Sequence, residues 1–172
     1  LDVEQTMVPL NHLLLDEAEV LPAMVVVRLP NGFTHFVVVW RKVGSWVELM
    51  DPATGRRWVR ASRFLEEVYI HEHRIAAAEW REWARSPGFA RPLGRRLDSL
   101  GAGARARLEV ALAAESWRDL AALDAAARLV ESLMESRAVK RGKEASRLFA
   151  GLLEKAAIPE PYWSVRLAPP PP

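Results

Sequence analysis

The chain has 172 residues, half of them hydrophobic, so it can bury one ordinary core or a small core with an appended helical unit. With 24 basic and 22 acidic residues, its net charge is only +2, and no overall field marks nucleic acid or an anionic membrane as a partner. Cysteine is absent, which excludes a disulfide framework, a thiolate metal site and a cysteine nucleophile within this chain. The longest apolar run, residues 23–27, is far shorter than the roughly 20 residues that span a bilayer.

Strand signals dominate residues 1–75, where β-branched clusters alternate with turn residues. The expected strands are residues 23–27, 36–40, 46–50, 57–60 and 68–70. Turns rich in Pro, Asn and Gly separate them, which predicts an antiparallel meander of about four to six strands. Ser62 is expected to cap a short helix, with Glu66 completing the capping box.

Residues 76–157 are instead rich in Ala, Leu, Arg and Glu, and their apolar residues recur at helical spacing. We expect three amphipathic helices, over residues 108–115, 120–134 and 145–153, with loops at 87–88 and 101–103. The Pro-rich segment 158–172 predicts an extended linker to a further part of the protein. Because the chain begins at Leu1 and not at methionine, we expect it to be a processed or excised piece.

Two residues could perform chemistry: His35, before one apolar run, and Asp51, at the end of the next. In an antiparallel pair, the start of one strand lies beside the end of its neighbour, so the two side chains can meet at one sheet edge. The carboxylate would then accept from one imidazole nitrogen and leave the other to activate a nucleophile. By spacing alone, the alternatives are an exposed histidine and an aspartate that forms a turn.

The surrounding motifs resemble a known family. A series of motifs occurs here in the order found in the second half of double-glycine leader peptidase domains. These motifs are Leu-Pro-Ala at 21–23, His-Phe-Val-Val at 35–38, Asp-Pro-Ala-Thr-Gly at 51–55 and Phe64. These papain-like cysteine peptidases stand at the start of bacteriocin-exporting ABC transporters. The resemblance implies an α+β fold, here a papain-like half-domain with an antiparallel sheet followed by a helical bundle. It also implies that His35 is a general base and Asp51 its orienting acid.

The family's first half does not appear in this chain. That half carries a glutamine of the oxyanion hole and an Asp-Cys-Gly motif with the nucleophile, and Gln5 lies in no such context. Without a thiolate, the histidine has nothing to activate, so we expect this chain to be inactive alone. The nucleophile comes from another segment of the protein, or the domain is degenerate and binds a peptide or docks a transporter without cutting.

The resemblance also implies partners and a location. A peptide substrate or leader peptide would bind, and the membrane and ATPase domains of an ABC transporter would be attached. This places the chain in the cytoplasm, at the inner face of a bacterial membrane. No cofactor, metal or nucleic acid is expected.

The remaining candidates carry weaker signals. His71 and His73 would share a strand face as a metal pair would, but no third ligand is placed. His12 has no partner that the sequence identifies. Trp40, Trp46 and Trp58 are expected to pack in the core or at the sheet edge, with a peptide groove as the alternative. The basic residues of 137–143 are expected to form a solvated helix junction. Trp80 and Trp83 lie near Arg81 and Arg85, as a nucleic-acid stacking site would require, but acidic residues interleave with them, so no nucleic-acid site is expected there.

Overall fold

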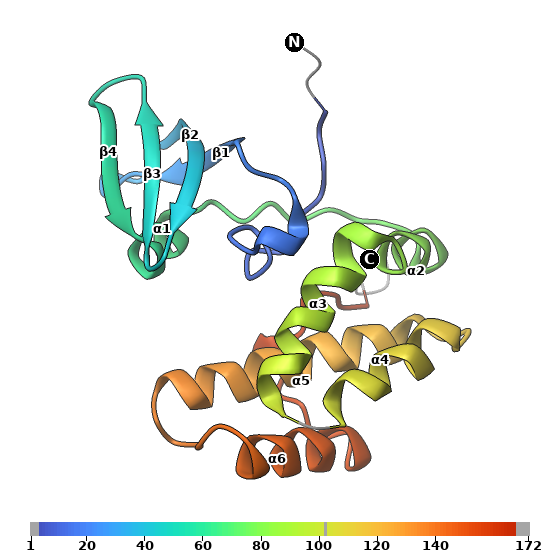
Figure 1. Cartoon of the computed structure of the whole chain (residues 1–172). Coiled ribbons are helices and arrows are strands. Elements are labelled where there is room, and N and C mark those ends of the chain that lie inside the picture. The colour runs from blue at the N-terminus through green and yellow to red at the C-terminus, as the bar shows by residue number, and fades with distance from the viewer. Residues whose placement is uncertain (1–3, 102, 168–172) are drawn as a thin grey trace. The chain divides into compact units, whose positions relative to one another are not determined.

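The computed structural model describes residues 4–101 and 103–167 of the chain, and it divides into two compact units (Figure 1). The first unit is Leu1–His73 and the second is Arg74–Pro172. Within the described residues, the first unit contains a four-stranded antiparallel sheet and one α-helix, and the second contains five α-helices. The chain is therefore α+β, as predicted. No described helix is both long enough and apolar enough to cross a membrane.

The sheet of the first unit is a simple meander. Its strands are β1 (Ala23–Arg28), β2 (Thr34–Val43), β3 (Trp46–Asp51) and β4 (Gly55–Arg60). They lie side by side in chain order, and each is antiparallel to the next. Four of the predicted strands are confirmed, because period-2 patterning and the Gly-containing turns both specify them.

One face of the sheet forms the core of this unit. Alternate residues of the central strands turn inward, including Val37, Val39, Val47 and Leu49, all 1% exposed or less. This face is covered by α1 (Ala61–Glu67) through the fully buried Phe64. The segment before β1, with the short helix η1 (Asp16–Ala18), adds its leucines at 13 and 14 to the same core.

Two predictions for this unit were wrong. Ser62 lies inside α1, whose N-cap is Arg60 and which has no capping hydrogen bond from that side chain. The helix starts earlier because it follows β4 without an intervening turn. Residues 68–70 form only an isolated bridge between Val68 and Val27. Ile70 is 64% exposed and finds no apolar surface to pack on, so a fifth strand does not develop.

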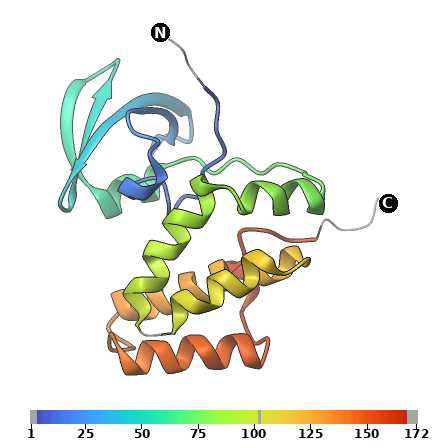
Figure 2. The same ribbon diagram turned by 45° about the vertical axis from the view of Figure 1, so that its right-hand side comes forward.

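The second unit is a bundle of five helices. They are α2 (Ala77–Ala84), α3 (Pro87–Leu100), α4 (Ala104–Ala113), α5 (Trp117–Glu135) and α6 (Lys143–Glu154). The long helix α5 contacts each of the other four, and α6 lies along it (Figure 2). Ser116 caps α5 by accepting a hydrogen bond from the backbone N–H of Arg118.

The sequence predicted only the last three of these helices. The loop expected at residues 87–88 is instead the start of α3, because proline is well tolerated at the first helical position, where no hydrogen-bonded N–H is needed. In α2, Trp80 is buried and its ring lies edge-on to those of Phe89 and Trp117. Trp83 joins the same aromatic cluster, with its ring centroid 5.0 Å from that of Phe89.

The chain after α6 is not a free linker over the described residues. Ile158, Trp163 and Val165 pack against the helical core, and η2 (Glu160–Tyr162) lies between them. The Ser164 hydroxyl donates to the carboxylate of Asp124 on α5. The extended linker predicted over 158–172 is therefore wrong for residues 158–165, because the apolar side chains between the prolines find a surface to cover. Residues 168–172 lie outside the described part of the chain.

A buried ion network fixes the helical bundle. Arg96 of α3 is 5% exposed, and it donates to the fully buried Asp124 at 2.6 Å and to both carboxylate oxygens of Glu131. Burial alone would lower the pKa of the Arg96 guanidinium, but the two carboxylates more than offset this and raise its pKa above the ordinary value. The two helices α3 and α5 are thereby held in one register.

Removing one member of this network should destabilise the protein strongly. We expect Asp124→Ala to cost about 3–5 kcal/mol in the free energy of unfolding, because Arg96 then loses a buried counter-charge. Asp98→Ala is the matched control, since Asp98 pairs with Arg105 at an exposed position and should cost less than about 1 kcal/mol. Urea denaturation measures both. Equal losses would show that the buried pair has no special role.

Candidate functional site

The sheet brings His35 and Asp51 together on its core face. His35 is the second residue of β2 and Asp51 is the last residue of β3, and these two strands are neighbours. Strand alternation places His35 on the same side as Val37 and Val39, and Asp51 on the same side as Leu49. The pair therefore lies on the buried face of the sheet, at the edge of that face.

The pair is joined by one short hydrogen bond, 2.9 Å between His35 Nε2 and Asp51 Oδ1. The same oxygen accepts the backbone N–H of Ala53 at 2.8 Å, which is how an aspartate before Pro52 closes its own turn. On the other side, Arg57 Nη2 lies 3.8 Å from Asp51 Oδ2. The Asp51 side chain is 7% exposed and that of His35 is 25% exposed, so the acid is buried and the base remains accessible.

The carboxylate of Asp51 is held ionised. The hydrogen bond from His35 lowers its pKa most, the N–H of Ala53 lowers it further, and together they outweigh burial, bringing the pKa of Asp51 from 3.8 to about 2. An ionised carboxylate can only accept hydrogen bonds. Nε2 of His35 must therefore carry the proton of this bond, and in the neutral ring the lone pair lies on Nδ1.

The lone pair on Nδ1 is the part of the site that can act as a base. The structure gives Nδ1 of His35 no hydrogen bond from residues 4–101 or 103–167. It can take a proton from a nucleophile, and Asp51 would stabilise the resulting imidazolium. The predicted juxtaposition of the two residues is thus present. The turn that was the alternative role of Asp51 is present as well, since its carboxylate accepts the Ala53 N–H. The sequence did not identify Arg57 as a neighbour of the carboxylate.

The other histidines form no second site. His12 is fully buried in the first unit. The rings of His71 and His73 are stacked with centroids 6.3 Å apart, and Tyr69 lies edge-on to His71. Among the described residues, no group of three or more His, Asp or Glu side chains could hold a metal ion.

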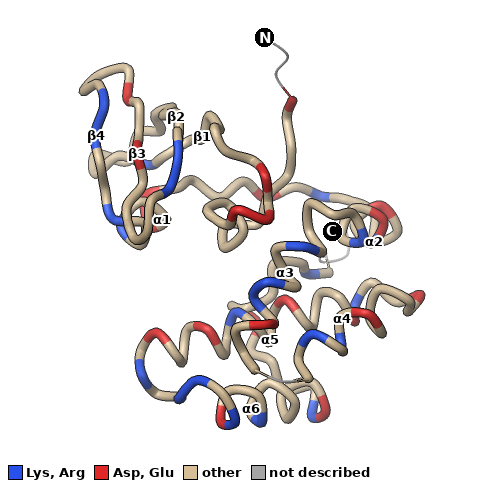
Figure 3. Tube along the Cα trace, viewed as in Figure 1, with Lys and Arg blue, Asp and Glu red and all other residues tan. Residues whose placement is uncertain are grey.

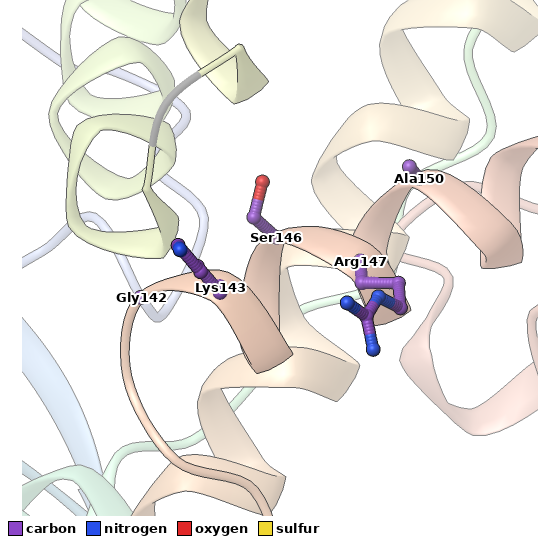
Figure 4. Close-up of a pocket in the computed structure, with 5 residues that line it drawn as sticks. All are labelled: Gly142, Lys143, Ser146, Arg147 and Ala150. Carbon is purple, nitrogen blue, oxygen red and sulfur yellow. The ribbon is translucent and has the colours of Figure 1, made fainter.

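Of the two described pockets, one lies in each unit. One, of about 520 Å³, is at the start of α6 and is lined by Gly142, Lys143, Ser146, Arg147 and Ala150 (Figure 4). The other is lined by residues 28–30 of the turn after β1 and by Arg63, Glu66 and Glu67 of α1. Neither is lined by His35 or Asp51, so the pair is not enclosed in a described cavity.

No protein-family model matches the chain, and no curated protein or solved structure matches it either.

The shifted carboxyl gives a direct test of the pair. We expect Asp51 to titrate near pH 2 and to move toward 3.8 in His35→Ala, because the largest cause of the lowered pKa is then lost. Since the folded pKa lies below the unfolded one, the stabilisation from Asp51 is complete above about pH 4 and lost as the pH falls toward 2. Carboxyl-detected NMR titration measures the shift, with His71→Ala as the control. An unchanged pKa in His35→Ala would disprove the contact.

Proposed function

We propose that this chain is the histidine and aspartate half of a papain-like thiol peptidase that trims a leader peptide after a Gly-Gly-type site. In this proposal His35 is the general base and Asp51 its orienting acid. The nucleophilic cysteine comes from another segment of the same protein or from a partner chain. The geometry that carries the proposal is the 2.9 Å hydrogen bond from His35 Nε2 to a buried, ionised Asp51.

The proposal is supported by the ring nitrogen of His35 that Asp51 does not engage, Nδ1, because this nitrogen can accept a proton. With Nε2 engaged by Asp51, Nδ1 of His35 would take the proton from the cysteine thiol and generate the thiolate. The thiolate would attack the peptide carbonyl carbon, and His35 would return the proton to the leaving amine as the peptide bond breaks. Water would then hydrolyse the thioester, with His35 again accepting and returning a proton.

The proposed setting follows the motif resemblance. A peptidase of this kind would work in the cytoplasm, at the inner face of a bacterial membrane, attached to the membrane and ATPase domains of an exporter. Its substrate would be an extended leader segment with small residues at the cleavage site. Catalysis would require no metal or cofactor, since acid, base and thiolate suffice for acyl transfer.

The alternative is a degenerate domain that binds a peptide or docks a transporter without cleaving. The absence of cysteine from all 172 residues favours it. The retained His35–Asp51 bond favours the peptidase, because a binding surface gains nothing from an oriented base with a vacant nitrogen.

The decisive experiment begins with the functional protein purified from its own source. Intact mass and N-terminal analysis should find a further, cysteine-bearing segment, joined to this chain or copurifying with it. Iodoacetamide should alkylate that segment and abolish cleavage of a leader peptide that contains Gly-Gly. In the same assembly, His35→Ala should lower kcat at least about a hundredfold, because proton transfer to and from the thiol is lost.

His71→Ala is the matched control, since it removes an imidazole from the same unit without touching Asp51, and it should leave kcat unchanged. If the functional protein contains no cysteine, or if it binds the leader peptide with equal affinity in the wild type and His35→Ala but never cuts it, the peptidase proposal fails and the binding alternative stands.

A further inference from the structure

The sheet has a second face, opposite the core, that is unusually apolar for an exposed surface. We define the outer face by six large side chains that point away from the core, namely Met24, Phe36, Trp40, Trp46, Met50 and Trp58. Cross-strand pairing places them together, since Met24 and Met50 both lie beside Val38, and Trp58 lies beside Glu48. They are between 40% and 68% exposed. Of the three tryptophans expected in the core or at the sheet edge, Trp58 lies on the edge strand β4. Trp40 and Trp46 lie on inner strands and are exposed, which corrects the expectation for these two.

These six side chains form one contiguous apolar surface and are not scattered single residues. Single exposed apolar residues are normal, but a contiguous group of this size on one face marks a surface that meets another apolar body. The irregularity of β2 between Val39 and Arg41 contributes to the group. Because Val39 points into the core, Trp40 points outward, and the shifted register then brings Arg41 to the outer face beside it.

The charges on the outer face are basic. Arg41 and Arg56 both pair with Glu48, which is only 3% exposed, so one carboxylate is shared by two arginines. Arg60 lies over the ring of Trp46 at 4.8 Å from its centroid, and Arg41 lies 5.6 Å from that of Trp58. The three arginines and one glutamate leave this face with a surplus of positive charge.

Apart from Glu48, several acidic residues of the same unit lie on other elements. Asp16, Glu17 and Glu19 belong to the segment around η1, and Glu66 and Glu67 to α1, and both elements pack on the core face. Figure 3 shows basic residues along β4 and acidic ones around η1. The outer face thus carries a surplus of positive charge, although the net charge of the whole chain is only +2.

We propose that the outer face binds the surface of an anionic lipid bilayer. Tryptophan prefers the boundary between lipid headgroups and acyl chains, and arginines at the same level attract anionic headgroups. Here Trp46 and Trp58 each carry an arginine against the ring, so aromatic and cationic groups would reach the headgroup layer together.

A peptide partner is less well matched. Neither of the two described pockets is lined by the six apolar residues of the outer face, so no described hollow would receive the anchoring side chain that peptide recognition uses. The proposal is independent of the peptidase proposal, because His35 and Asp51 lie on the core side of the sheet.

Flotation of the full chain with vesicles tests the proposal. The chain should float with vesicles of phosphatidylcholine and phosphatidylserine, much less with phosphatidylcholine alone, and less as salt is raised. The variant Met24→Ser, Phe36→Ser, Trp40→Ser should bind at least about tenfold more weakly, because it removes exposed apolar surface only. Circular dichroism should show that it melts as the wild type does.

The matched control replaces three exposed apolar residues elsewhere, Ile70→Ser, Val110→Ser and Leu167→Ser. It should float as the wild type does. The proposal is overturned if the wild type ignores anionic vesicles at low salt, or if both triple variants bind equally. It is also overturned if the outer face instead holds two copies together, seen as a dimer in light scattering that the first variant abolishes and that does not float.

Discussion

An ionised carboxylate can accept hydrogen bonds but cannot donate them, and the candidate site depends on this constraint. Asp51 is kept ionised by the N–H groups of His35 and Ala53, which hold its pKa near 2. The proton between His35 and Asp51 must therefore belong to Nε2, and Nδ1 remains as the base. The turn that ends β3 is what places the carboxylate, since the residue after Pro52 supplies its second donor.

The two faces of the meander carry different groups of side chains. Inward-facing residues such as Val37 and Leu49 form the core, and the His35–Asp51 pair lies on the same side, at the sheet edge. Outward residues such as Phe36 and Trp40 remain exposed. Because side chains alternate along a strand, one strand, β2, contributes both to the proposed chemistry and to the proposed membrane-binding surface without either interfering with the other.

Much of the fold could be predicted where local signals and tertiary packing agree. The four strands, and the meeting of His35 with Asp51, follow from alternation and from the geometry of neighbouring antiparallel strands. The errors arise where packing decides. The sequence predicts a loop at Pro87, but this residue begins a helix. Trp40 is expected in the core or at the sheet edge, but it faces solvent. Trp163 lies in a Pro-rich segment that is expected to be a linker, but it packs on the helical unit. Sequence patterns give a period, but not which of two faces another element will cover.

The proposed role of His35 as a base is tested most directly by its tautomer, measured by ¹⁵N NMR on the imidazole nitrogens of the folded chain. In the neutral ring, we expect a proton on Nε2, an unprotonated Nδ1, and loss of this preference in Asp51→Ala. A proton on Nδ1 in the wild type would contradict this role, because the nitrogen assigned to activate the nucleophile would then be a donor and could not act as a base.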